Sequence, residues 1–299
     1  MSIATSILCP VDFSPDAERA LRHAVALAGS AGARLTLLTV NDPILVTALK
    51  VTGRQDALRR QIQEALQDTL ARVPTPAPPV VPAIDVATGS PATEILEAVT
   101  RVEADLVVIG TRGLGRAGQL LFGSTTERVL HAASVPVLVV PDYAPERMSI
   151  ELGVTRYTVH RVIAAAGLDP ADAVVAASAA AWARECAAGL TLAHVCAAPP
   201  TPSWWPFPAA AAEDDRLESA MEQLATLGRT VEHPTPVGLE VRRGHVASEL
   251  AALAREADAG MVVLSRGAGT HRLGATAYRV AVSAHVPTLV VSAPPPPAA

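Results

Sequence analysis

The stretch Gly110 to Thr126 reads GTRGLGRAGQLLFGSTT and joins a glycine-rich loop to the start of a helical pattern. It follows Leu106 to Ile109 (LVVI), a short apolar run that predicts a strand buried on both faces. The glycine-rich loop therefore leaves the end of a core strand. A strand, a loop and a helix in this order predict a parallel α/β sheet.

Three glycines of the loop, Gly110, Gly113 and Gly123, can adopt positive φ and carry no Cβ, so backbone N–H groups can approach an anion closely. Ser124 to Thr126 then place free N–H groups and hydroxyls at a helix N-terminus. Phosphate is the natural ligand of such a site. The alternative is a loop that needs glycine only for its turns.

The composition restricts the class of protein. A chain of 299 residues, half of them apolar, is long enough for two domains of about 150 residues. The net charge of -5 and the absence of a basic run argue against a nucleic-acid partner. No stretch approaches the roughly 18 apolar residues of a membrane span. Cys9, Cys186 and Cys196 have no CxxC spacing, so we expect reduced, mostly buried thiols in a soluble cytoplasmic protein.

Strand and helix patterns alternate through the first half of the chain, which predicts one parallel sheet covered by helices on both faces. The expected strands are Thr5–Val11, Arg34–Val40, Val80–Thr88, Leu106–Ile109 and Val135–Val140. Ligands of such sheets bind beyond the carboxyl ends of the strands, where Asp12, Val40 and Gly110 fall.

The pattern then repeats, which indicates a duplication. Val162–Leu168 followed by Asp169 resembles the first strand and its acid, and Val286–Val291 (VPTLVV) resembles Val135–Val140 (VPVLVV). Matching positions differ by 157 residues at the start and by 151 at the end. We expect a first domain over 1–143, a linker over 144–158, a second domain over 159–293 and a disordered, proline-rich tail over 294–299.

The loop pattern, a glycine, two residues, a glycine, nine residues and then Gly-Ser, resembles that of nucleotide-binding members of the universal stress protein family. The resemblance implies two tandem α/β domains, each a doubly wound, Rossmann-like five-stranded parallel sheet of the adenine nucleotide alpha hydrolase type. It also implies ATP with Mg²⁺ in the first domain. The matching positions are Pro10, Val11 and Val40 for adenine, and Ile109, Gly110, Gly113, Gly123, Ser124, Thr125 and Thr126 for phosphate and ribose.

Asp12 and the two loop arginines near these positions each have two possible roles. Asp12 is expected to accept from a ribose hydroxyl or to help hold Mg²⁺, directly or through water; the alternative is an acid that only favours a helix N-terminus. Arg112 and Arg116 either pair with phosphates or are solvated. His23, His131 and His160 show no metal-ligand spacing.

The second half departs from the loop pattern. Ser265 replaces the first glycine, the segment up to Gly274 is four residues shorter, and Ala275 replaces Ser124, whereas Thr276 is kept. Losing hydrogen bonds to a charged group costs about 1.5 to 3 kcal/mol each. We therefore expect a degenerate second domain that acts as a structural partner of the first.

The resemblance implies a regulatory ATP-binding protein of the stress response with at most weak hydrolysis, since no general base is evident in the loop. The alternatives are a slow ATP-hydrolysing enzyme of related fold and a nucleotide-free interaction module. The family also implies pairing of the domains through their last strands, a homodimer in some cases, and a protein partner still to be identified. The loop with Trp204 and Trp205 is either a binding surface or a cover over its own domain.

Overall fold

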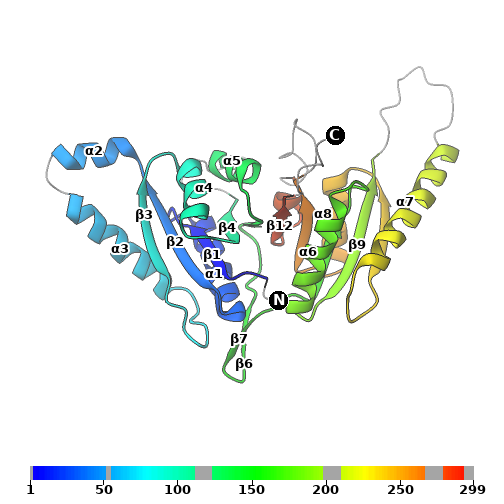
Figure 1. The fold of residues 1–299 in the computed structure, drawn as a ribbon, viewed down its shortest axis with the longest axis horizontal. Helices are drawn as coiled ribbons and strands as arrows, with labels where there is room; N and C mark the ends of the chain where they lie inside the picture. The colour runs from blue at the N-terminus through cyan, green and yellow to red at the C-terminus, as the bar shows by residue number, and fades with distance from the viewer. Residues whose placement is uncertain (1–2, 52–54, 112–122, 198–209, 267–278, 293–299) are drawn as a thin grey trace, which may run out of the picture. The chain divides into compact units, whose positions relative to one another are not determined.

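The structure is a computed structural model that describes all residues except 1–2, 52–54, 112–122, 198–209, 267–278 and 293–299. The expected tail and the Trp204–Trp205 loop lie outside the described residues. The chain divides into two compact units, Met1–Thr158 and Val159–Ala299. Each unit is an α/β domain with a parallel sheet (Figure 1).

The first unit contains a five-stranded parallel sheet with the order β3-β2-β1-β4-β5, which confirms the predicted fold class. Its strands start or end within a few residues of the predicted bounds. They are β1 (Ser6–Pro10), β2 (Arg34–Asn41), β3 (Ala83–Thr88), β4 (Leu106–Gly110) and β5 (Val137–Val140).

In the described residues, five helices connect these strands: α1 (Pro15–Ala31), α2 (Pro43–Val51), α3 (Gln55–Ala71), α4 (Pro91–Arg101) and α5 (Ser124–Ala132). The chain runs outward from β1 to β3 and then returns to β4 on the other side of β1. Because parallel crossovers are right-handed, this reversal puts α4 and α5 on the face opposite to α1. All of β4 is buried as a consequence.

The sequence of α1 explains its position. Ser14 caps the helix by accepting from the Ala17 amide, and Pro15 begins the first turn. The apolar stripe of α1 is buried, and the helix ends at Ala31, where Gly32 follows as the C-cap with a φ of 65°. The stripe consists of Ala17, Leu21, Ala24, Val25 and Ala28. Cys9 in β1 is fully buried, and burial raises the pKa of its thiol to about 12.

Helix α2 was not expected from the sequence, because its run of apolar residues has no clear periodicity. The pair Asp42-Pro43 is typical of a helix start and could have predicted α2. The Asp42 Oδ1 accepts from the Ile44 amide at 2.7 Å, and Pro43 is the first helical residue. Ile44 is 80% exposed, so this short helix is not a core element.

The second unit repeats the architecture with the order β10-β9-β8-β11-β12. Its strands are β8 (Arg161–Ala165), β9 (Gly189–Cys196), β10 (Gly238–Arg243), β11 (Met261–Ser265) and β12 (Thr288–Val291). Its helices include α6 (Asp172–Glu185), α7 (Ala210–Thr230) and α8 (Val246–Glu256).

The strand registers correct the expected alignment of the two halves. Ser6 pairs with Arg34 in the first unit and Arg161 pairs with Gly189 in the second, so both counterparts differ by 155 residues. The same difference holds through β4 and β11, whereas β5 and β12 differ by 151, as expected from a deletion in the loop between them. An alignment by 157 at the start was therefore wrong.

The corrected register changes the counterpart of Asp12. A difference of 155 assigns Gly167 to this position and assigns Asp169 to the position of Ser14. The unusual backbone supports this alignment, since Phe13 and its counterpart Leu168 both have positive φ, 62° and 60°. The second unit therefore has no carboxylate at the position of Asp12.

The segment expected as a linker, 144–158, contains an antiparallel hairpin of β6 (Met148–Glu151) and β7 (Val154–Tyr157). It packs on the first unit, because the Thr155 amide donates to the Ala77 carbonyl at 2.8 Å and Tyr157 Oη lies 2.8 Å from His23 Nδ1. Burial lowers the pKa of His23 to about 3, so the ring is neutral. The two strands are joined at Leu152-Gly153, where both residues have positive φ, as a two-residue hairpin turn requires.

At the amino end of the sheet Asp105 connects β4 to β1, and this contact predicts a pH dependence. Its carboxylate accepts from Thr5 Oγ1 at 2.6 Å and from the amides of Thr5 and Ser6. Burial alone would raise the pKa of Asp105, but these hydrogen bonds outweigh it and the pKa lies below its ordinary value. Because the folded pKa is lowered, the stabilisation is present above the unfolded pKa of about 3.9 and is lost as pH falls through the folded pKa.

We therefore expect Asp105→Asn to lose about 1 kcal/mol of unfolding free energy at pH 7, and the gap from wild type to be smaller at about pH 3, below the unfolded pKa. Urea denaturation of both proteins at the two pH values measures this. A gap that is the same at both values would contradict the assigned contact.

Candidate site at the carboxyl end of the first sheet

The chain reverses its winding direction between β1 and β4, and the predicted residues gather at the carboxyl ends of these strands. Leu8 pairs with Val107, so Val11 lies level with Gly110 when the register is continued. Pro10 pairs with Leu38, so Asp12 lies level with Val40. Crevices at such reversal points are where doubly wound sheets bind ligands.

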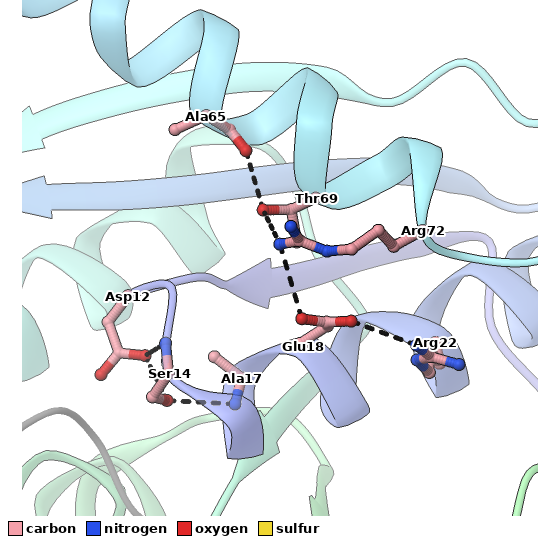
Figure 2. A network of polar contacts seen from close by, with 8 residues as sticks. All are labelled: Asp12, Ser14, Ala17, Glu18, Arg22, Ala65, Thr69 and Arg72. Carbon is pink, nitrogen blue, oxygen red and sulfur yellow. Dashed lines mark hydrogen bonds and ion pairs between the residues drawn. The ribbon is translucent and has the colours of Figure 1, made fainter.

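Asp12 follows β1 and its carboxylate is exposed. Its Oδ1 accepts from Ser14 Oγ at 2.6 Å and from the Ser14 amide at 3.1 Å, and Ser14 in turn accepts from the Ala17 amide (Figure 2). This chain of bonds fixes the carboxylate at the start of α1, where the helix dipole favours negative charge.

The first turns of α1 are also held from the other side. Glu18 pairs with Arg22 at 3.1 Å and with Arg72, at the end of α3, at 3.6 Å (Figure 2). Arg72 contacts Thr69, whose hydroxyl donates to the Ala65 carbonyl. The helix that follows Asp12 is thereby joined to Arg72 at the end of α3.

The backbone of Val40 points toward the end of β1. The Leu38 carbonyl accepts from the Val11 amide at 2.8 Å, whereas the Asn41 carbonyl faces β3 and accepts from Gly89. Because neighbouring residues of a strand point their backbone groups to opposite sides, the N–H and C=O of Val40 face the β1 side, beyond the Val11 bond. The side chain of Val40 is half-buried and that of Val11 is 3% exposed.

The described ends of the glycine-rich loop close on each other. The Gly123 amide donates to the Thr111 carbonyl at 3.0 Å, and Thr126 Oγ1 donates to the Gly110 carbonyl at 2.9 Å. Ser124 is exposed and Thr125 is half-buried at the first turn of α5. The hydroxyl of Thr126 is buried and its proton is used in this closure, so Thr126 connects α5 to β4.

The expected role of positive φ in these glycines was wrong for the two that the structure describes. Gly123 has a φ of -64° and a ψ of 135° as the N-cap of α5, and Gly110 continues β4. Glycine is needed at 110 for packing, since a Cβ there would lie 2.8 Å from the backbone C and O of Asp16. Arg112, Gly113 and Arg116 lie outside the described residues.

Sequence reasoning missed two residues of this region. Thr111 Oγ1 donates to Asp16 Oδ2 at 2.9 Å, and both side chains are buried. Asp16 lies in the first turn of α1, and no local pattern shows that its side chain meets a residue 95 positions away.

The corresponding region of the second unit is occupied by its own carboxylates. Asp172 accepts from the amides of Gly167 at 2.8 Å and Asp169 at 3.1 Å, and Asp169 accepts from Ala171 at 2.7 Å. Burial raises the pKa of Asp172, and the neighbouring Asp169 carboxylate adds to this effect. The amides of Gly167, Asp169 and Ala171 are thus already bonded to carboxylates of the same chain.

Residues around β11 differ as well. Ser265 ends β11 at the position where Gly110 ends β4, and α6 starts at Asp172, two residues later than the counterpart of Pro15. Arg266 replaces Thr111 and contacts Ser292. Gly274, Ala275 and Thr276 lie outside the described residues.

Comparison with known proteins adds the family. The model of the universal stress protein family matches residues 4–141 and 158–292, one match in each unit. The chain belongs to the universal stress protein family. Both of its domains are therefore universal stress protein domains in tandem.

Single relatives match about half of the chain. A universal stress protein of Thermus aquaticus is 37% identical over 137 residues, which are 45% of this chain and 97% of the relative. Another from Methanocaldococcus jannaschii is 32% identical over 136 residues, 45% of this chain and 80% of the relative.

Among solved structures, a universal stress protein from Archaeoglobus fulgidus has a TM-score of 0.62 at 18% identity. That match covers 97% of this chain and 98% of the other, so it supports the tandem fold. In the part of the chain that the structure describes, no helix has both the length and the apolar character needed to cross a membrane.

Proposed function

We propose that the N-terminal domain of this universal stress protein binds ATP at the carboxyl end of its sheet and that occupancy by the nucleotide regulates the protein under stress. The observation that carries the proposal is the assembly of three ligand-binding features at one reversal point. These are the backbone of Val40, which faces the β1 side beyond the Val11 bond, the exposed carboxylate of Asp12 and the N-terminus of α5.

The base is recognised by β1 and β2. An adjacent N–H and C=O from Val40 matches the acceptor and donor pattern of the adenine edge, and Pro10 and Val11 provide apolar contacts at the end of β1. Asp12 lies level with Val40 and accepts from a ribose hydroxyl in this arrangement.

The phosphates are bound by the α5 side of the site. The amides of Ser124 and Thr125 belong to the first helical turn, which has no acceptors within the helix, and the helix dipole favours an anion there. Ile109 and Gly110 form the end of β4 below them. The Gly123 amide is bonded to Thr111, so Gly123 contributes close approach and not a donor.

Of the residues at this site, only the Asp12 carboxylate is assigned here as a magnesium ligand. In the described residues no group of three or more His, Cys, Asp and Glu side chains could hold a metal ion. Mg²⁺ commonly keeps several waters and binds one or two carboxylates together with substrate phosphates. The exposed carboxylate of Asp12 would then hold the ion next to the phosphates, directly or through water.

One ATP per chain is the expected stoichiometry, because the second unit lacks the Asp12 carboxylate and uses its own Asp172 at the amides beyond β8. Isothermal titration calorimetry of the full chain with MgATP measures the stoichiometry. Asp12→Ala should weaken binding, whereas Asp169→Ala should leave it within about twofold of wild type. Two equivalent sites would contradict the assignment, and no binding at all would favour a nucleotide-free interaction module.

A further inference from the structure

A buried hydrogen bond joins the two halves of the candidate site. Thr111, the first residue after β4, donates from Oγ1 to Asp16 Oδ2 in the first turn of α1 at 2.9 Å. The two side chains are 4% and 7% exposed. Buried hydrogen bonds to a charged group are strong and directional, so this contact sets the position of Thr111 relative to α1.

Hydrogen bonds connect Thr111 and its neighbour Gly110 to the start of α5. Its carbonyl accepts from the Gly123 amide at 3.0 Å, and Gly123 is the N-cap of the helix. On the neighbouring residue, the Gly110 carbonyl accepts from Thr126 at 2.9 Å. A shift of Thr111 therefore moves the start of α5 with respect to the start of α1.

We propose that Asp16 is a positioning residue that keeps the phosphate-binding start of α5 in register with the base-binding ends of β1 and β2. The proposal rests on the proposed nucleotide binding, and Asp16 acts through Thr111 without touching the nucleotide. The second unit carries Ala171 and Arg266 at the two counterpart positions, so it cannot form this bond.

The test compares a ligand that spans both halves with one that occupies only the base half. Asp16→Ala should weaken ATP binding about tenfold, equivalent to about 1.4 kcal/mol, and adenosine binding less than twofold. Thr111→Val should have the same selective effect. Asp16→Asn keeps an acceptor oxygen for Thr111 and should restore the ATP-to-adenosine ratio of wild type, as should Thr111→Ser.

A matched control exists at the opposite end of the same strands, where Thr5 donates to Asp105 at 2.6 Å. Thr5→Val removes a Thr–Asp contact between the residues that precede β1 and β4, far from the candidate site, and should leave the affinity ratio unchanged. The proposal is overturned if Asp16→Ala weakens the binding of ATP and of adenosine by the same factor. It is also overturned if Thr5→Val changes the ATP-to-adenosine affinity ratio as much as Asp16→Ala does, because Asp16 would then only stabilise the fold.

Hydrogen exchange separates this inference from the proposed function. In ligand-free protein the Gly123 amide should exchange at least about threefold faster in Asp16→Ala than in wild type, and at the wild-type rate in Thr5→Val and Asp16→Asn. If wild-type protein binds no ATP, the proposed function fails, but the exchange rate of the Gly123 amide still tests whether Asp16 positions α5. An unchanged exchange rate in Asp16→Ala would overturn the positioning role of Asp16.

Discussion

Gly110→Ala should destabilise the N-terminal domain by about 3 kcal/mol, the upper part of the range for overpacked sites. The added Cβ would meet the backbone C and O of Asp16 at 2.8 Å and its Cβ at 3.0 Å. Backbone atoms cannot rotate away as a flexible side chain would, so α1 has to move from β4. Urea denaturation followed by circular dichroism measures the loss.

Two control variants isolate the cause. Ser265→Ala changes the counterpart in β11, where a Cβ is already present, and should cost less than about 0.5 kcal/mol beyond the loss of its hydroxyl contacts. Gly32→Ala introduces strain at a φ of 65° with open space around it, and should cost about 1 kcal/mol. A Gly110→Ala effect no larger than that of Gly32→Ala would show that α1 and β4 are not tightly packed at this point.

Gly123→Val should weaken ATP binding at least about a hundredfold, while the domain stays folded. Its φ of -64° and ψ of 135° suit valine, so the substitution adds no backbone strain. The fold should lose only about 1 kcal/mol, because valine is a poor N-cap. The new β-branched side chain at the start of α5 would occupy the space in which the phosphates approach Ser124 and Thr125.

Calorimetric titration with MgATP and a thermal unfolding curve should be recorded for the same sample of Gly123→Val. Gly274→Val, the matching change in the sequence of the second half, serves as the control and should keep ATP affinity within about twofold. Similar losses in both variants, or wild-type affinity in Gly123→Val, would place the phosphates elsewhere.

The fold class could be predicted because short segments of the sequence show the apolar patterns of single strands and helices. Buried strands such as Leu106–Gly110 are continuous apolar runs, and α1 shows its cap at Ser14 and its apolar stripe within one segment. The repeat of these patterns predicted two domains without any contact being known. The reversal point of the sheet, with Asp12 and Gly110 beside it, followed from parallel α/β topology.

Local patterns failed where alignment or pairing depends on distant residues. The acid after the first strand was matched to Asp169, but strand pairing shows that Gly167 holds that position. The hairpin over Met148–Tyr157 is short, and its place is set by contacts with His23 and Ala77, both far away in the sequence. Short strands of this kind carry little periodicity of their own.

The sequence by itself determined that this chain has two α/β domains, that the first carries a complete glycine-rich loop and that the second does not. Tertiary structure alone decided what these residues contact. Gly110 is a glycine because Asp16 packs against it, and Thr111 meets the Asp16 carboxylate across 95 positions of chain. Such pairs are fixed when α1 packs on β4, and close packing between distant segments leaves no trace in the periodicity of either one.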